Sequence, residues 1–248
     1  MKYSKNKKVS FDSGTHSYFL KNKKLTSVTT LINKFKNEFD SDFWSKKIAK
    51  KENTTQQIIL KKWKDKAFKS TEIGTAIHKI FEDYTNQNYC VTNGKLEFEY
   101  NKLNSEFMED FNMKKEISLK FINDFFITKR LIPVESEFIV YNDFLAGQLD
   151  MICKDQDGNF YILDFKTNEK IDTCSYGKTM KGIFSHLDDA SYFHYCLQLS
   201  IYKRMLKQYD IKQMFLVHIT AEKYEFIECR DVMNDIDINL LKDLINQN

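Results

Sequence analysis

Residues 146–168, AGQLDMICKDQDGNFYILDFKTN, decide the fold that we expect for this chain. Two short apolar runs flank the polar segment KDQDGN, and alternating apolar residues around Asp-Gly are a strong signal for a β-hairpin. We expect a loop at 156–158 with Gly158 in the left-handed position. In that register Asp150 faces Asp164 across the hairpin.

The facing aspartates place two carboxylates side by side in otherwise hydrophobic strands. Directly opposed side chains lie about 4.5–5.5 Å apart at Cβ, where like charges are destabilising. Lys166 points to the same face as Asp164 because side chains alternate along a strand. Carboxylates held together in this way suggest a divalent-cation site, although an aspartate in a strand is more often simply solvated. The hairpin alone therefore gives a hypothesis that the rest of the chain must support.

The composition is that of a folded protein. Of the 248 residues, 42% are hydrophobic and 15% aromatic, which are globular values and not those of a disordered chain. One proline and seven glycines leave no Pro- or Gly-rich linker. We therefore predict a single domain over 1–248, with a largely helical N-terminal part, 31–130, and a catalytic core, 131–230.

The cysteines and the apolar runs lead us to expect a soluble intracellular protein. Five cysteines without a C-x-x-C pair argue against a disulfide framework and against a zinc knuckle, and suggest a reducing compartment. The N-terminal residues lack the apolar region of a signal peptide, and no apolar run is long enough to span a membrane.

Positive charge gathers in one segment. Residues 46–69 contain nine lysines against two acidic residues, a net charge of +7, whereas the whole chain carries +3. Such a local positive field indicates a surface that binds a polyanion. The alternative interpretation is that the lysines only keep the surface of a helix solvated. Trp44, Trp63 and Phe68 lie within or next to the segment, so charge and stacking together could follow a nucleic-acid strand.

The periodicity of apolar residues predicts an α/β protein. Residues 168–189 show no periodicity and are expected to form a long loop, which in a compact domain is usually functional or disordered. The predicted strands are 16–20, 25–28, 134–141, the two strands of the 146–168 hairpin, 214–220 and 224–229. The predicted helices are 31–35, one from residue 43 capped by Ser41 or Asp42, 55–86 either continuous or broken near Ser70, 98–129 either continuous or interrupted, 191–209 and 231–246.

Side chains suited to chemistry fall into four groups along the chain. A G-T-x-x-H motif puts His78 on a helix, with Glu82 one turn later on the same face. The other groups are Glu135 and Glu137 on the strand 134–141; Asp150, Asp164, Lys166 and Thr167 in the hairpin; and Gln198 and Tyr202, four residues apart on the helix 191–209.

The order of these groups resembles the RecB-type branch of the PD-(D/E)XK nuclease superfamily. The motifs that carry the resemblance are the histidine, a glutamate, G-x-x-D at 147–150, D-x-K-T at 164–167 and Q-x-x-x-Y at 198–202. Further similarity, to compact exonucleases related to the mitochondrial genome maintenance exonuclease and to phage and large-virus nucleases, lies in H-x-Y at 16–18, S-V-T at 27–29 and the run 185–202.

This resemblance covers most of residues 11–220 and implies the fold. It implies an α/β fold with a central mixed β-sheet flanked by helices, a restriction-endonuclease-like core, and an N-terminal helical region. The eponymous proline before the first aspartate is absent, and G-x-x-D is a familiar variant of this branch.

The resemblance also implies the roles of the site residues. Asp150 and Asp164, with the main-chain carbonyl of Phe165 and the imidazole of His78, would bind Mg²⁺ or Mn²⁺, hard cations that prefer oxygen ligands. Glu135 or Glu137 would approach the same metal, and the resemblance favours Glu135 slightly. The implied catalytic residues are Lys166, Asp150, Asp164 and Glu135, and the implied substrate-binding residues are Gln198, Tyr202, Thr167 and Lys181.

The implied activity is that of a metal-dependent DNA nuclease, most similar to an exonuclease on single strands or free ends. A helicase or another replication or recombination protein would be its partner. The alternatives are a structure-selective or restriction-like endonuclease and a catalytically inactive nucleic-acid-binding subunit, although no ligand position is replaced. The cysteines do not match the four-cysteine pattern of iron–sulfur relatives, so we predict no cluster, and no phosphate-binding G-x-x-x-x-G-K-[ST] motif indicates an ATP motor.

Overall fold

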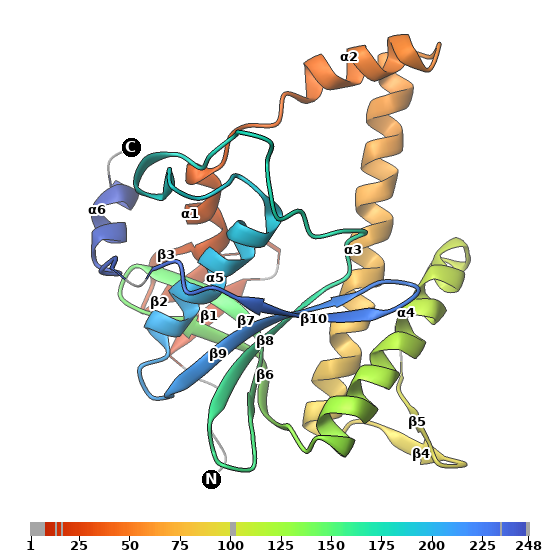
Figure 1. Ribbon diagram of the computed structural model, residues 1–248, viewed down its shortest axis with the longest axis vertical. Helices are drawn as coiled ribbons and strands as arrows, with labels where there is room; N and C mark the ends of the chain where they lie inside the picture. Colours follow the sequence, from red (N-terminus) through yellow and green to blue (C-terminus); the bar gives the residue numbers. More distant parts are fainter. Residues whose placement is uncertain (1–7, 13, 16, 100–102, 234, 247–248) are drawn as a thin grey trace.

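The structure is a computed structural model that describes residues 8–12, 14–15, 17–99, 103–233 and 235–246. Within them a mixed β-sheet of eight strands lies between helices (Figure 1). The predicted architecture, a central mixed sheet flanked by helices, is confirmed. His16, with which the predicted first hairpin begins, lies outside the described residues.

Most predicted elements are present. The strands are β1 (Val9–Asp12), β2 (Ser17–Leu20), β3 (Lys23–Ser27), β4 (Cys90–Thr92), β5 (Lys95–Glu97), β6 (Ile132–Tyr141), β7 (Leu145–Lys154), β8 (Phe160–Lys166), β9 (Ile211–Ile219) and β10 (Tyr224–Cys229). The helices are α1 (Val28–Phe35), α2 (Ser41–Lys51), α3 (Gln56–Asn86), α4 (Met108–Phe121), continued by a π-helical segment (Ile122–Thr128), α5 (Ser191–Met205) and α6 (Leu240–Asn246).

The central hairpin, β7 and β8, has the predicted register. Met151 pairs with Leu163 and Lys154 with Phe160, so Asp150 and Asp164 occupy the next facing positions. Gly158 has a φ of +86°, the left-handed conformation that the loop requires and that glycine adopts without a Cβ penalty. Beyond Leu163 the strand β8 leaves β7 and stays paired only with β9, in parallel.

One edge of β7 is divided between two partners. The opposite edge of β7 is not divided, because β6 pairs with it along its length, from Ala146 to Lys154. The divided edge pairs with β3 at Leu145 and Ala146 and with β8 from Met151 onward. Residues 147–150, the G-x-x-D motif, therefore lie in a gap between β3 and β8, where no strand of the described residues pairs with them on this edge.

The two larger hydrophobic cores cover the two faces of the sheet. Ile162 packs into the core shared with α1 and α5, whereas Leu163 and Phe165 pack into the core shared with α3 and α4, as expected when side chains alternate. On β7, however, Leu149 and Ile152 belong to the same core although they are three residues apart. The alternation thus reverses around Asp150, at the gap in the sheet.

Several predicted element boundaries are wrong. The helix α2 is capped by Asp40, whose carboxylate accepts from the Phe43 N–H at 2.8 Å, and not by Ser41 or Asp42. The helix α3 runs through Ser70 without a break, because one serine costs a helix only a fraction of a kcal/mol, on the order of 0.5.

Other predicted helices are shorter than expected. The expected helix 98–129 begins only at Met108, after a 3₁₀ turn at Ser105–Phe107, and the short hairpin β4–β5 lies just before residue 98. The helix α5 ends at Met205 rather than 209, and the closing helix α6 begins at Leu240 rather than 231. In the part of the chain that the structure describes, no helix combines the length and the apolar character needed to cross a membrane.

Candidate metal and catalytic site

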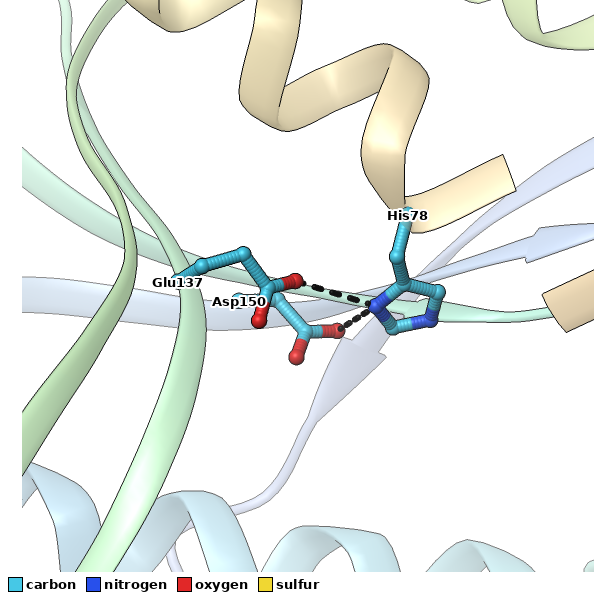
Figure 2. Close-up of side chains that lie close together, drawn as sticks. All are labelled: His78, Glu137 and Asp150. Atoms are coloured by element: carbon cyan, nitrogen blue, oxygen red, sulfur yellow. Dashed lines mark hydrogen bonds and ion pairs between the residues drawn. The ribbon is translucent and has the colours of Figure 1, made fainter. Parts of the chain in front are cut away.

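Three side chains that can bind a metal meet beside the gap in the sheet. The Nδ1 atom of His78 lies 3.3 Å from Glu137 Oε1 and 3.5 Å from Asp150 Oδ2 (Figure 2). One ligand atom from each residue lies within 4.8 Å of the other two. His78 comes from α3, Glu137 from β6 and Asp150 from β7, so three separate elements converge on one point.

The backbone of Phe165 holds two of these three ligands in place. Its N–H donates to Asp150 Oδ2 at 2.7 Å, and its carbonyl accepts from His78 Nε2 at 2.9 Å. Because a carbonyl can only accept, Nε2 carries a proton. Nδ1 is then the ring nitrogen that faces the two carboxylates. The ring of Phe165 stacks on Phe81 of α3, with centroids 3.7 Å apart.

The negative charge of the cluster raises the pKa of His78. Burial alone would lower the pKa of His78, but the carboxylates of Asp150 and Glu137 outweigh burial and raise that pKa to about 9. The imidazole is therefore protonated at neutral pH in the absence of a cation. A bound metal must replace that proton, because metal-ligating histidine is neutral.

Glu137, and not Glu135, belongs to the cluster. Glu137 Oε2 accepts from the Gln148 side chain at 2.6 Å, which leaves Oε1 facing His78. Glu135 instead lines a separate pocket with Met205 and Tyr209. Alternation would place both glutamates on one face, but Glu137 has a φ of +48°, and this left-handed backbone redirects its side chain. The slight preference for Glu135 is not supported by this geometry.

Asp164 and Lys166 form a second group. Lys166 Nζ lies 2.5 Å from Asp164 Oδ2, and the side chains are only 18% and 3% exposed. Burial raises the pKa of Asp164 despite the neighbouring ammonium. Burial would lower the pKa of Lys166, but the carboxylates of Asp164 and Asp150 outweigh it and raise that pKa, so the ammonium keeps its charge.

Residues of α5 approach the site from the opposite face of the sheet. Lys166 Nζ lies 4.8 Å from the centre of the Tyr195 ring, a cation–π contact. Gln198 donates to the Tyr202 hydroxyl at 3.1 Å, and both residues line a pocket of about 220 Å³ together with Asp150 and Glu137. The gap in the sheet thus lets α3 and α5 contribute to one site.

Gly147 makes room for Tyr202. A Cβ atom at Gly147 would lie 2.5 Å from both the hydroxyl oxygen and Cε1 of Tyr202, far inside van der Waals contact. Tyr202 is itself 1% exposed and belongs to the α5 core. The glycine of the G-x-x-D motif is therefore explained by packing against the tyrosine of Q-x-x-x-Y.

The remaining predicted site residues lie at different distances from the cluster. Thr167 packs against α3, where its Oγ1 would lie 3.1 Å from a Cβ at Gly74, and its carbonyl accepts from Lys114 Nζ at 2.6 Å. Lys181 is exposed at a 3₁₀ turn, and its N–H donates to the Phe35 carbonyl. The Phe165 carbonyl, which the resemblance implies as a metal ligand, accepts from His78 Nε2 in this structure.

Sequence reasoning missed Gln148 and Tyr195. Gln148 lies inside the G-x-x-D motif, and Tyr195 lies one helical turn before Gln198, so both positions were adjacent to recognised motifs. Side-chain direction at the gap in the sheet could not be read from the pattern, because alternation reverses there.

The donor set suits a hard divalent cation. Among the described residues, the ligand atoms that converge here are one imidazole nitrogen and carboxylate oxygens from Glu137 and Asp150. Carboxylate oxygens are the ligands that Mg²⁺ and Mn²⁺ prefer, whereas a thiolate site would select zinc or iron–sulfur chemistry. The residues present therefore fit Mg²⁺ or Mn²⁺.

Comparison with known protein families agrees with this geometry. Residues 41–243, more than half of the chain, match the family described as PDDEXK-like domain of unknown function (DUF3799). None of the curated proteins compared with this chain matches it. The matched region contains all three converging ligands together with Asp164, Lys166, Gln198 and Tyr202. The chain therefore belongs to the PDDEXK-like family and, with it, to the PD-(D/E)XK nuclease superfamily, which indicates a nuclease.

Proposed function

We propose that this chain is a Mg²⁺- or Mn²⁺-dependent deoxyribonuclease that acts as an exonuclease on single strands or free DNA ends. The observation that carries the proposal is the convergence of His78, Glu137 and Asp150 next to a buried, charged Lys166. A phosphodiester is anionic and resists attack by water, so its hydrolysis requires the positive charge that such a site gathers.

The residues of the chain divide the work between them. Glu137 and Asp150, with His78 Nδ1, would hold the cation, and the Phe165 backbone and Gln148 fix their orientation. When bound, the cation would neutralise part of the charge on the phosphate and would lower the pKa of a water molecule that it binds. Lys166 keeps its proton and so offers a fixed positive charge for the charge that develops on the phosphate.

Gln198 and Tyr202 would contact the substrate side of the site. Gln198 is only partly buried, and its amide lies in the small pocket that Asp150 and Glu137 also line. An amide in this position can hydrogen-bond a phosphate oxygen or a sugar without adding charge. The buried Tyr202 hydroxyl holds that amide in place.

Product analysis on matched substrates tests the proposal. Purified protein is incubated with end-labelled linear and closed circular single-stranded DNA, with Mg²⁺ or Mn²⁺ and with EDTA. We expect cation-dependent release of short products from the linear DNA and none from the circle. The Lys166→Ala and Asp164→Ala proteins should be inactive, and undiminished cleavage by either would overturn the assignment.

The same experiment separates the modes of cleavage. Equal attack on circles would keep the nuclease and replace the exonuclease by an endonuclease. Absence of cleavage together with absence of Mn²⁺ binding in calorimetry would instead favour a nucleic-acid-binding subunit.

A further inference from the structure

A helical arm extends away from the sheet. It consists of α2 and the first part of α3, residues 39–72, which we call the basic arm (Figure 1). From residue 60 to residue 72 nearly every side chain of α3 is exposed, and burial against the domain resumes only at Ile73. A helix with nearly all of its side chains exposed gains little from burying an apolar face against the core.

The charge of the arm is not neutralised within the protein. Of the nine lysines between residues 46 and 69, four lie in ion pairs with aspartate or glutamate: Lys46, Lys62, Lys66 and Lys69. The ion pairs of the described residues do not include the other five: Lys47, Lys50, Lys51, Lys61 and Lys64. A surface with this excess of ammonium groups attracts a polyanion.

Large apolar side chains are exposed on the same arm. Phe39, Phe43 and Phe68 are 67%, 53% and 57% exposed. Trp44 is also accessible, and Lys47 Nζ lies 4.7 Å from the centre of its ring. Trp63 packs on Phe39, with centroids 5.7 Å apart, and so supports the surface. Exposed rings among lysines are the combination that binds unpaired bases and their phosphates together.

The arm is continuous with the catalytic site. Lys61 and His78 lie on the same helix, 17 residues or about 26 Å apart at 1.5 Å per residue. At the base of the arm a groove of about 1190 Å³ is lined by Lys66, Phe68 and Lys69 of the arm and by Thr167. Its lining also carries acidic side chains, among them Asp110, Glu169 and Glu225. Thr167 directly follows Lys166 in the chain, so the groove adjoins the end of β8, the strand that carries Lys166.

We infer that the basic arm binds single-stranded nucleic acid on its exposed lysines and rings, an inference that rests on the proposed nuclease function. Single strands are favoured over duplex because stacking on exposed rings requires unpaired bases. A second copy of the chain is a poor occupant, because two arms that each carry a net charge of +4 over residues 39–72 repel each other.

Charge-matched variants test this inference. The arm variant is Lys50→Gln/Lys61→Gln/Lys64→Gln, and the control is Lys24→Gln/Lys207→Gln/Lys242→Gln, whose lysines are equally exposed but lie outside the arm. Binding of labelled oligodeoxythymidylate is measured by fluorescence anisotropy in EDTA across a salt series. Each lost phosphate contact lowers the salt slope by about 0.7 on a single strand, so the arm variant should lose about 2 units of slope and at least about tenfold in affinity. The control should match wild type.

A stacking variant gives an independent reading. Phe43→Ala should lower affinity at least about fivefold while leaving the salt slope unchanged, because it removes a ring and no charge. Circular dichroism of each variant confirms that the arm remains helical.

The outcomes separate this inference from the proposed function. Binding is measured without a cation, and cleavage of a dinucleotide, too short to reach the arm, reports the catalytic site alone. We expect the arm variant to cleave the dinucleotide like wild type. Arm and control variants with equal affinity would overturn the inference while the nuclease stands. The inference would also be overturned if the wild-type protein were a dimer, and if the arm variant broke that dimer without changing the affinity for DNA.

Discussion

Two groups of carboxylates lie within one site, and their surroundings differ. Asp164 is 3% exposed and has its own counter-charge in Lys166. Asp150 and Glu137 are 12% and 20% exposed, and the partner that they share is an imidazole that can lose its proton. The first group is neutralised by the protein itself, whereas the second is arranged to accept a cation. We therefore propose that the second group binds the metal and that the first supplies fixed charge, whereas the resemblance implied Asp164 as a further metal ligand.

The largest effect is expected at Asp150. Asp150→Asn keeps the shape of the side chain but removes the charge that a cation needs, so Mn²⁺ binding should be lost. Cleavage should fall by at least about 10²- to 10³-fold, the scale of losing one electrostatic contact to the transition state. Calorimetry with Mn²⁺ and single-turnover cleavage measure the two effects. Asp157→Asn, exposed in the loop of the same hairpin, should change neither.

The neutralised group should respond differently. Lys166→Met leaves Asp164 buried without its ammonium, which costs about 3–5 kcal/mol, or a melting temperature lower by about 10 °C. Adding Asp164→Asn to the same protein should restore most of that stability but none of the cleavage. Mn²⁺ should still bind to Lys166→Met. Loss of Mn²⁺ binding in a folded Lys166→Met protein would erase the distinction between the two groups.

Substituting the two glutamates of β6 one at a time tests which of them belongs to the group with His78 and Asp150. Glu137→Gln should weaken Mn²⁺ binding by at least about tenfold, since one charged ligand is worth upward of 1.4 kcal/mol. Glu135→Gln should leave the affinity within about twofold of wild type, because Glu135 lies in a different pocket. The reverse ranking in a calorimetric titration would restore the sequence-based preference for Glu135.

The smallest expected effect concerns two glycines. Gly147→Ala places a Cβ 2.5 Å from the buried Tyr202 ring, and such overpacking costs about 1–3 kcal/mol, or about 2–10 °C in melting temperature. Gly74→Ala meets only Thr167 Oγ1 at 3.1 Å and gains helix propensity, so it should be nearly neutral. Differential scanning calorimetry ranks the two variants. Equal melting temperatures would show that Tyr202 yields easily.

The hairpin register could be predicted from the sequence because it follows from local chemistry. The Asp-Gly turn and the alternation of apolar residues fix which positions of β7 and β8 face each other, and Met151 does pair with Leu163. The order of motifs was likewise sufficient to identify the superfamily.

The choice between Glu135 and Glu137 could not be predicted because it depends on a backbone irregularity. A left-handed φ at a glutamate has no sequence signature, and it reverses the side-chain direction that alternation implies. The roles of Tyr195 and of the Phe165 carbonyl depend on how α5 and α3 pack on opposite faces, which is tertiary information. The length of α3 beyond Ser70 is similarly decided by its packing from Ile73 onward.

Phe165 links the hydrophobic core to the candidate metal site. Its peptide groups hold Asp150 and His78, while its ring is stacked on Phe81 deep in the core under α3. A substitution such as Phe81→Leu, which touches no ligand, would let this ring shift and would change the spacing of the two ligands. We therefore expect hydrophobic residues to tune cation affinity, which would give sequence drift in the core a direct route to altered metal preference.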